Sequence, residues 1–211
     1  MINAAIGSVD KNLKSANIVK YLIIDNSTIV PFKICEDICG KNAASKIEIV
    51  RNYVGYNRKI YFFKDHSHSR GILKAIELCK TDLMLLIDHD IILKNDIDFI
   101  DDVVNDDDII GAFNIRNKFH NKLKMYVKRA SPFLMLLNIA KLKKHNIKFY
   151  DDTYDKNRSL VSYSTGYTFL QNICKSNLKY KDIDLTKYIN HYFRGSAASQ
   201  EKIVEFLNDN K

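Results

Sequence analysis

A chain of 211 residues is long enough for one domain with a sizeable core and short for two. With 46% hydrophobic and 27% charged residues, its composition is globular and excludes a disordered, fibrous or collagen-like chain. The formal charge of +8 attracts acidic partners without identifying one, and compositional drift toward lysine is an equally good explanation.

Two features of the sequence bear on localisation and redox state. No uninterrupted apolar run reaches the ~18 residues of a membrane helix, and the N-terminus lacks the layout of a signal peptide. We therefore expect no transmembrane segment and a cytoplasmic protein. The four cysteines are expected to be structural thiols. Zinc at Cys35 and Cys39 is a weaker alternative, because no second close Cys or His pair follows them.

Strands and helices are expected to alternate along the chain. Residues 2–9 slightly favour a strand over a helix. Further on, β-rich apolar runs predict strands, and apolar residues at helical spacing predict helices. The expected strands cover 19–25, 59–63, 82–87, 109–114 and 133–137, and the expected helices cover 69–80, 98–105, 139–145, 166–176 and 203–207. This order predicts an α/β domain with a mostly parallel central sheet flanked by helices.

The strand over 82–87 ends in the triplet Asp88-His89-Asp90. Two aspartates separated by one residue, at the end of a buried strand, can direct oxygen ligands toward one point outside the sheet. Mg²⁺ or Mn²⁺ suits such carboxylates, since both are hard cations. A solvated strand end is the alternative, but the apolar residues on both sides of the triplet favour a metal site.

Several motifs follow one another along the chain. They are the strand ending Ile23-Ile24-Asp25-Asn26-Ser27, the helix 71–80, the segment 83–90, Ser164-Thr165-Gly166-Tyr167, and His191-Tyr192-Phe193-Arg194-Gly195-Ser196. In these motifs and their order, over most of 19–196, the chain resembles glycosyltransferases of the GT-A fold, in particular the family 2-like branch. The resemblance implies a single Rossmann-like GT-A domain, with a donor-binding half of about 1–115 and an acceptor-side half of about 116–211.

The resemblance also implies an activity, the transfer of a sugar from a nucleotide-sugar donor such as a UDP- or GDP-sugar. In such enzymes the D-x-D acids hold a divalent cation against the donor's two phosphates, so Asp88 and Asp90 would hold Mn²⁺ or Mg²⁺. Asp90 would be the direct ligand, and Asp88 would face the ribose or the metal. Asp25, followed by Asn26, matches the acid that recognises the nucleobase, although a turn or cap aspartate is the alternative.

Three further positions follow from the same resemblance. His191 matches a third metal ligand, and imidazole suits Mn²⁺; a surface-loop histidine is the alternative. Arg194 and Ser196 would contact the diphosphate. Arg70, near the start of the helix that leads to the D-x-D strand, is a candidate phosphate or sugar contact.

The sequence departs from the family at the catalytic base. An inverting enzyme needs a carboxylate near the start of the helix that begins at Gly166, where this chain has Ser164 and Thr165. The nearest acids upstream are Asp155, Asp152 and Asp151, which become the candidate bases. Inverting and retaining stereochemistry both stay open.

Two other functions fit parts of the sequence. The missing acid at Ser164 also fits a non-catalytic module that binds nucleotide sugars or glycans. The positive charge also fits a nucleic-acid-associated protein, including a glycosyltransferase that acts on nucleic acid. The acceptor is therefore unknown, with a glycan and a nucleic acid both open.

Overall fold

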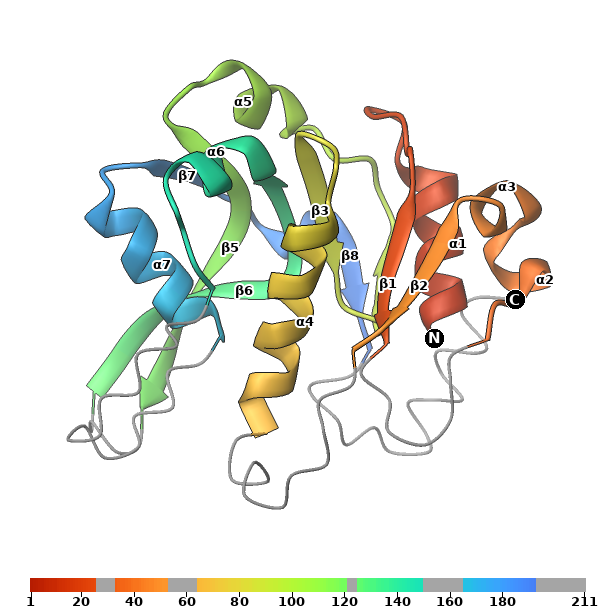
Figure 1. Ribbon diagram of the computed structural model, residues 1–211, viewed down its shortest axis with the longest axis horizontal. Coiled ribbons are helices and arrows are strands. Elements are labelled where there is room, and N and C mark those ends of the chain that lie inside the picture. The colour runs from red at the N-terminus through yellow and green to blue at the C-terminus, as the bar shows by residue number, and fades with distance from the viewer. Residues whose placement is uncertain (26–32, 53–63, 121–124, 150–164, 193–211) are drawn as a thin grey trace.

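The computed structural model describes residues 1–25, 33–52, 64–120, 125–149 and 165–192. Helices lie on both sides of the strands (Figure 1). The helices are α1 (Ile2–Asn12), α2 (Glu36–Cys39), α3 (Lys41–Ala44), α4 (Lys64–Leu78), α5 (Ile100–Asn105), α6 (Ile139–Lys144), α7 (Thr165–Lys175) and the 3₁₀ turn η2 (Leu185–Lys187). The strands are β1 (Tyr21–Asp25), β2 (Ile47–Arg51), β3 (Leu83–Ile87), β4 (Ile91–Leu93), β5 (Ile109–His120), β6 (Met125–Asn138), β7 (Lys179–Asp182) and β8 (Ile189–His191).

The strands form three hydrogen-bonded groups within the described residues. The largest has the order β3-β6-β5-β7, in which β6 runs antiparallel to both neighbours and β7 runs parallel to β5. β1 and β2 form a parallel pair, and β4 and β8 an antiparallel pair. The protein is thus α/β, but the prediction of a mostly parallel sheet is wrong. The prediction failed because a strand that is buried on both faces has the same apolar sequence whether its neighbours are parallel or antiparallel to it.

Strand β6 carries the core on both of its faces. Leu134 and Leu136 pack with side chains of α1, α5, β4 and η2, whereas Met135 and Leu137 pack with α4, α6 and α7. All four side chains are buried, so the alternation of a strand divides the interior into two apolar layers. The second layer includes the stacked rings of Phe149 and Phe169.

Most expected elements are found, with two corrections in the first half of the chain. Residues 2–9 belong to helix α1, not to a strand. Its residues Ala5, Ile6 and Val9 are buried at helical spacing, and this packing outweighs the β-propensity of isoleucine and valine. The helix expected over 69–80 begins earlier, at Lys64. The strand expected over 59–63 and the helix expected over 203–207 lie outside the described residues.

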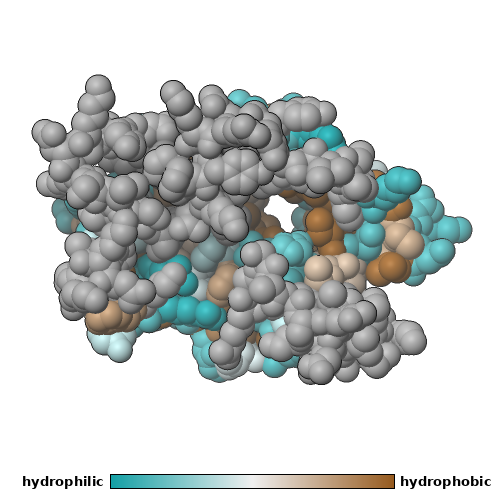
Figure 2. Space-filling view, turned by 90° about the horizontal axis from the view of Figure 1, so that it is seen from below, coloured by the Kyte–Doolittle hydropathy of each residue, from teal (hydrophilic) through white to brown (hydrophobic). Residues whose placement is uncertain are grey.

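Large apolar side chains are exposed at two ends of the molecule. Figure 2 shows hydrophobic atoms among hydrophilic ones at its right-hand end, where α2 lies in Figure 1, and Ile38 of that helix is 55% exposed. At the other end, Phe119 and Tyr126 of the β5–β6 hairpin are 43% and 70% exposed. The four cysteines are free thiols, as expected. Among the described helices, none combines the length and apolarity needed to cross a membrane.

Candidate functional site

The two aspartates of the D-x-D triplet lie in a turn that links β3 to β4. The backbone N–H of Asp88 donates to the carbonyl of Phe133 at 3.0 Å, which extends the pairing of β3 with β6 by one residue. The carbonyl of Asp88 then accepts from the N–H of Ile91 at 3.3 Å, which closes the turn. His89 is exposed, Asp88 is half-buried and Asp90 is only 5% exposed. The turn therefore directs the Asp90 carboxylate into the protein.

Strand β8 brings His191 to this turn from about a hundred residues further along the chain. It pairs with β4 so that His191 lies opposite Ile91, and the N–H of Tyr192 donates to the carbonyl of Asp90 at 3.2 Å. As a result, Nε2 of His191 lies 3.3 Å from Oδ2 of Asp90. The structure thus places together two of the residues for which the sequence predicts a metal-binding role.

Helix α1 holds β4 in place through two polar side chains. The hydroxyl of Ser8 accepts from the N–H of Leu93 at 2.9 Å and donates to the carbonyl of Ala5 at 2.7 Å. The Nδ2 of Asn12 donates to the carbonyl of Leu93 at 2.6 Å. Because β4 directly follows Asp90, the first helix of the chain supports the geometry of the D-x-D turn.

Tyr188 secures the other strand of this pair. Its carbonyl accepts from the N–H of Lys94 at 2.8 Å, and its hydroxyl donates to Oδ1 of Asp98 at 2.6 Å. Burial and, secondarily, the neighbouring Asp98 carboxylate raise the pKa of Tyr188 to about 12. The phenol therefore stays protonated, and it anchors the segment that enters β8.

Two further residues, Phe133 and Arg116, lie beside the site and belong to no motif of the sequence. The ring of Phe133 lies 4.3 Å from the His191 ring, centroid to centroid, and packs one side of the imidazole. The guanidinium carbon of Arg116 lies 4.8 Å from the centre of the Phe133 ring, within cation–π range. Arg116 also donates from Nε to Asn114 at 3.1 Å. No spacing signal in the sequence marks these contacts, because they depend on how β5, β6 and β8 are placed.

The geometry of Asp90 and His191 suits two ligands of one cation. Ligand atoms at bond lengths of about 2.1 Å on adjacent corners of an octahedron lie roughly 3 Å apart. The observed 3.3 Å between the carboxylate oxygen and the imidazole nitrogen is close to this separation. Across the described part of the chain, however, no three His, Cys, Asp or Glu side chains form a group that could hold a metal ion. The pair would therefore need further ligands from elsewhere.

Asp25 is buried at the end of β1, the strand end at which the sequence analysis expects it. Its Oδ2 lies 3.4 Å from Nε of Arg51, which is its register partner on the parallel strand β2. The carboxylate is therefore charge-paired within the protein, a partner that the sequence analysis did not consider. Its predicted contact with a nucleobase stays a prediction.

The remaining predicted site residues cannot be placed as side chains. Arg70 lies inside α4 and not near its start, since the helix begins at Lys64; the small helix-propensity penalties of Ser and His let the helix extend through 66–69. This removes the argument from a helix N-terminus for Arg70. The other predicted donor contacts and bases lie outside the described residues: Asn26, Arg194, Ser196, Asp151, Asp152 and Asp155.

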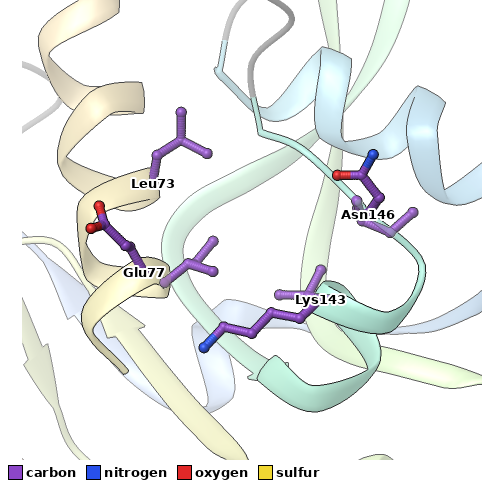
Figure 3. A pocket seen from close by; sticks show the side chains of 7 residues that line it. Leu73, Glu77, Lys143 and Asn146 are labelled. Carbon is purple, nitrogen blue, oxygen red and sulfur yellow. The ribbon is translucent and has the colours of Figure 1, made fainter. Parts of the chain in front are cut away.

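A separate cavity of about 290 Å³ opens between α4 and the region of α6 (Figure 3). Aliphatic side chains form most of its wall, with Glu77, Lys143 and Asn146 as the polar groups. The amine of Lys143 also donates to the carbonyl of Cys79 at 3.2 Å. None of the predicted site residues lines this cavity, so a cation held by Asp90 and His191 would not lie in it.

No protein-family model and no curated protein sequence matches this chain.

Proposed function

We propose that this protein is a metal-dependent glycosyltransferase of the GT-A type that transfers a sugar from a nucleotide-sugar donor to an acceptor. One observation carries the proposal. Asp90, the second acid of the D-x-D triplet, is buried beside His191, and the two are the residues that the sequence resemblance assigns to one cation. The two residues are about a hundred positions apart, so their contact is not a consequence of local sequence.

The architecture supports the proposal in a general way. The acids follow the end of β3 in an α/β domain, and ligands of such domains commonly bind outside the carboxyl ends of strands. On this account, residues 1–115 bind the donor and residues 116–211 form the acceptor side. Arg116 joins the site as a cation that can contact a donor phosphate, since its guanidinium lies over Phe133, which in turn contacts His191.

Asp90 and His191 would hold the Mn²⁺ or Mg²⁺ ion, and Asp88, half-buried in the same turn, would face the ribose or the metal. A carboxylate paired with an imidazole favours Mn²⁺ over Mg²⁺, which prefers an all-oxygen shell. When bound, the cation neutralises charge that builds up on the departing nucleoside diphosphate. Phe133 fixes the orientation of the imidazole, and α1 fixes the turn that carries Asp90.

The assay is donor hydrolysis or transfer over a panel of UDP- and GDP-sugars, with Mn²⁺ or with a chelator. The proposal predicts turnover that needs the metal and is lost in Asp90→Ala. Turnover that is unchanged by both the chelator and this substitution would refute the proposal. Tight nucleotide binding with no turnover over a broad donor and acceptor panel would instead identify a non-catalytic binding module.

The base of an inverting reaction would be Asp155, Asp152 or Asp151. Replacing the true base by asparagine lowers turnover by about 10² to 10⁴ with little change in donor affinity, because the proton moves only in the transition state. Single variants therefore distinguish the three acids once an acceptor is known. If all three keep near wild-type turnover, the base assignment fails, and a retaining mechanism or a base supplied elsewhere becomes the better account.

A further inference from the structure

The positive charge of this protein is concentrated in one segment. Residues 109–150 contain ten lysines and arginines and no aspartate or glutamate, out of 33 basic and 25 acidic residues in the chain. The rest of the chain has a net charge of −2. Compositional drift would spread lysines evenly, so this distribution indicates a local role for the charge.

Two of these lysines serve the fold. The amine of Lys141 donates to the carbonyls of Val103, Asp106 and Ile109, and that of Lys143 donates to the carbonyl of Cys79. Six other basic residues fall between positions 116 and 129. We call residues 116–120 of β5 and 125–129 of β6, which pair at the outer end of the hairpin, the basic arm. Four of the six basic residues lie in this arm.

The basic arm projects from the body of the molecule at the lower left of Figure 1. Its register places Arg116 opposite Arg129 and Asn117 opposite Lys128. Because side chains alternate along a strand, Lys128 lies on one face of the arm and the two arginines lie on the other. Lys128 is exposed, so an anion can approach it from solvent.

The same arm carries an exposed aromatic pair. Phe119 and Tyr126 are register partners, and their ring centroids lie 5.3 Å apart in an edge-to-face contact. They are 43% and 70% exposed, and they lie on the same face as Lys128, two residues along each strand from the pair of Asn117 and Lys128. An aromatic residue with a polar tip beside a lysine matches the composition of protein surfaces at lipid headgroups.

We propose that the basic arm binds the surface of membranes that contain anionic phospholipids. The cations would contact lipid phosphates, and Phe119 and Tyr126 would lie at headgroup depth. Nucleic acid is less favoured, because the two rings pack edge to face and so do not offer parallel faces on which successive bases could stack. The proposal does not depend on glycosyl transfer.

Vesicle co-sedimentation of the full-length chain tests this directly. We expect binding to vesicles of phosphatidylcholine mixed with phosphatidylglycerol, little binding to phosphatidylcholine alone, and weakening as salt is raised. A lysine near such a surface contributes about fivefold, so Lys128→Gln should weaken binding roughly fivefold. Tyr126→Ser should weaken it further, because it removes the exposed ring.

The matched control removes the same charge elsewhere, through Lys175→Gln, at an exposed lysine outside the arm. This substitution should leave vesicle binding within about twofold of wild type. Equal losses in the two lysine variants would show a general charge effect and overturn the proposal, as would equal binding to neutral vesicles. A short single-stranded DNA is titrated in parallel. DNA binding that is tighter than vesicle binding and is lost in the arm variant would make the arm a nucleic-acid surface instead.

Discussion

Ser8→Ala tests the idea that helix α1 supports the D-x-D turn through β4. The Ser8 hydroxyl is buried and accepts from the N–H of Leu93, a residue with no exposed surface. Alanine removes this acceptor and leaves the N–H buried without its partner. Water cannot replace the hydroxyl at such a depth, so the loss includes the cost of desolvating the donor.

The magnitude follows from these contacts. A buried donor that loses its acceptor costs about 1–3 kcal/mol, and the second bond, from Ser8 to the carbonyl of Ala5, places the expected value near 2 kcal/mol. For a chain of this size such a loss lowers the melting temperature by about 4–8 °C. The bond from Asn12 to Leu93 remains, so the fold should persist.

Urea denaturation followed by circular dichroism measures the free energy of unfolding. Ser45→Ala is the matched control, because Ser45 makes the same kind of hydroxyl-to-carbonyl bond, to Asn42 at 2.8 Å, in an exposed position. It should cost no more than about 0.5 kcal/mol. If Ser8→Ala costs as little as this control, the hydroxyl does not hold β4 and the reasoning fails.

Three further substitutions probe the packing and the site. Gly166→Ala should destabilise the fold by about 3 kcal/mol or more, because a Cβ at Gly166 would lie 1.7 Å from the carbonyl oxygen of Ala130. Urea denaturation measures this loss. A loss below about 1 kcal/mol would show that α7 does not pack this closely on β6. Because the pKa of Tyr188 is raised to about 12, its phenol stabilises the fold fully below about pH 10 and loses this effect as the pH rises toward about 12. Tyr188→Phe should therefore flatten the fall in the free energy of unfolding at alkaline pH. An unchanged slope would contradict the assigned pKa. His191→Ala should weaken Mn²⁺-dependent nucleotide binding roughly tenfold, since a neutral ligand holds the cation less strongly than Asp90 does; equal affinities would exclude His191 as a ligand.

Local patterns in the sequence are sufficient to predict features that depend on a single helix or strand. The buried strand 83–87 and the helix over 166–176 show clear periodicity, and the structure has β3 and α7 at these positions. The position of Asp88 and Asp90 after β3 follows from the apolar run alone. These features depend on short-range propensity and burial, both of which are visible in sequence.

Features that depend on long-range pairing could not be predicted in the same way. The direction of β6 is set by its pairing with β3 and β5, and the short polar strands β7 and β8 have no apolar run to mark them. The contacts of Phe133 with His191 and of Arg116 with Phe133 arise from that pairing. Helix α1 was misjudged because its apolar residues pack against β4 and other distant segments rather than against sequence neighbours.

The most direct test of the proposed function is calorimetric titration of UDP and GDP into the protein with Mn²⁺ present and absent. The account predicts binding that requires Mn²⁺ and falls at least about 100-fold in Asp90→Asn, since an amide keeps the size of the side chain and removes the charge that holds the cation. The control Asp107→Asn, at an exposed aspartate of the loop before β5, should bind as wild type does. Mn²⁺-dependent binding of equal strength in wild type and Asp90→Asn would contradict the assignment of the buried acid to the metal.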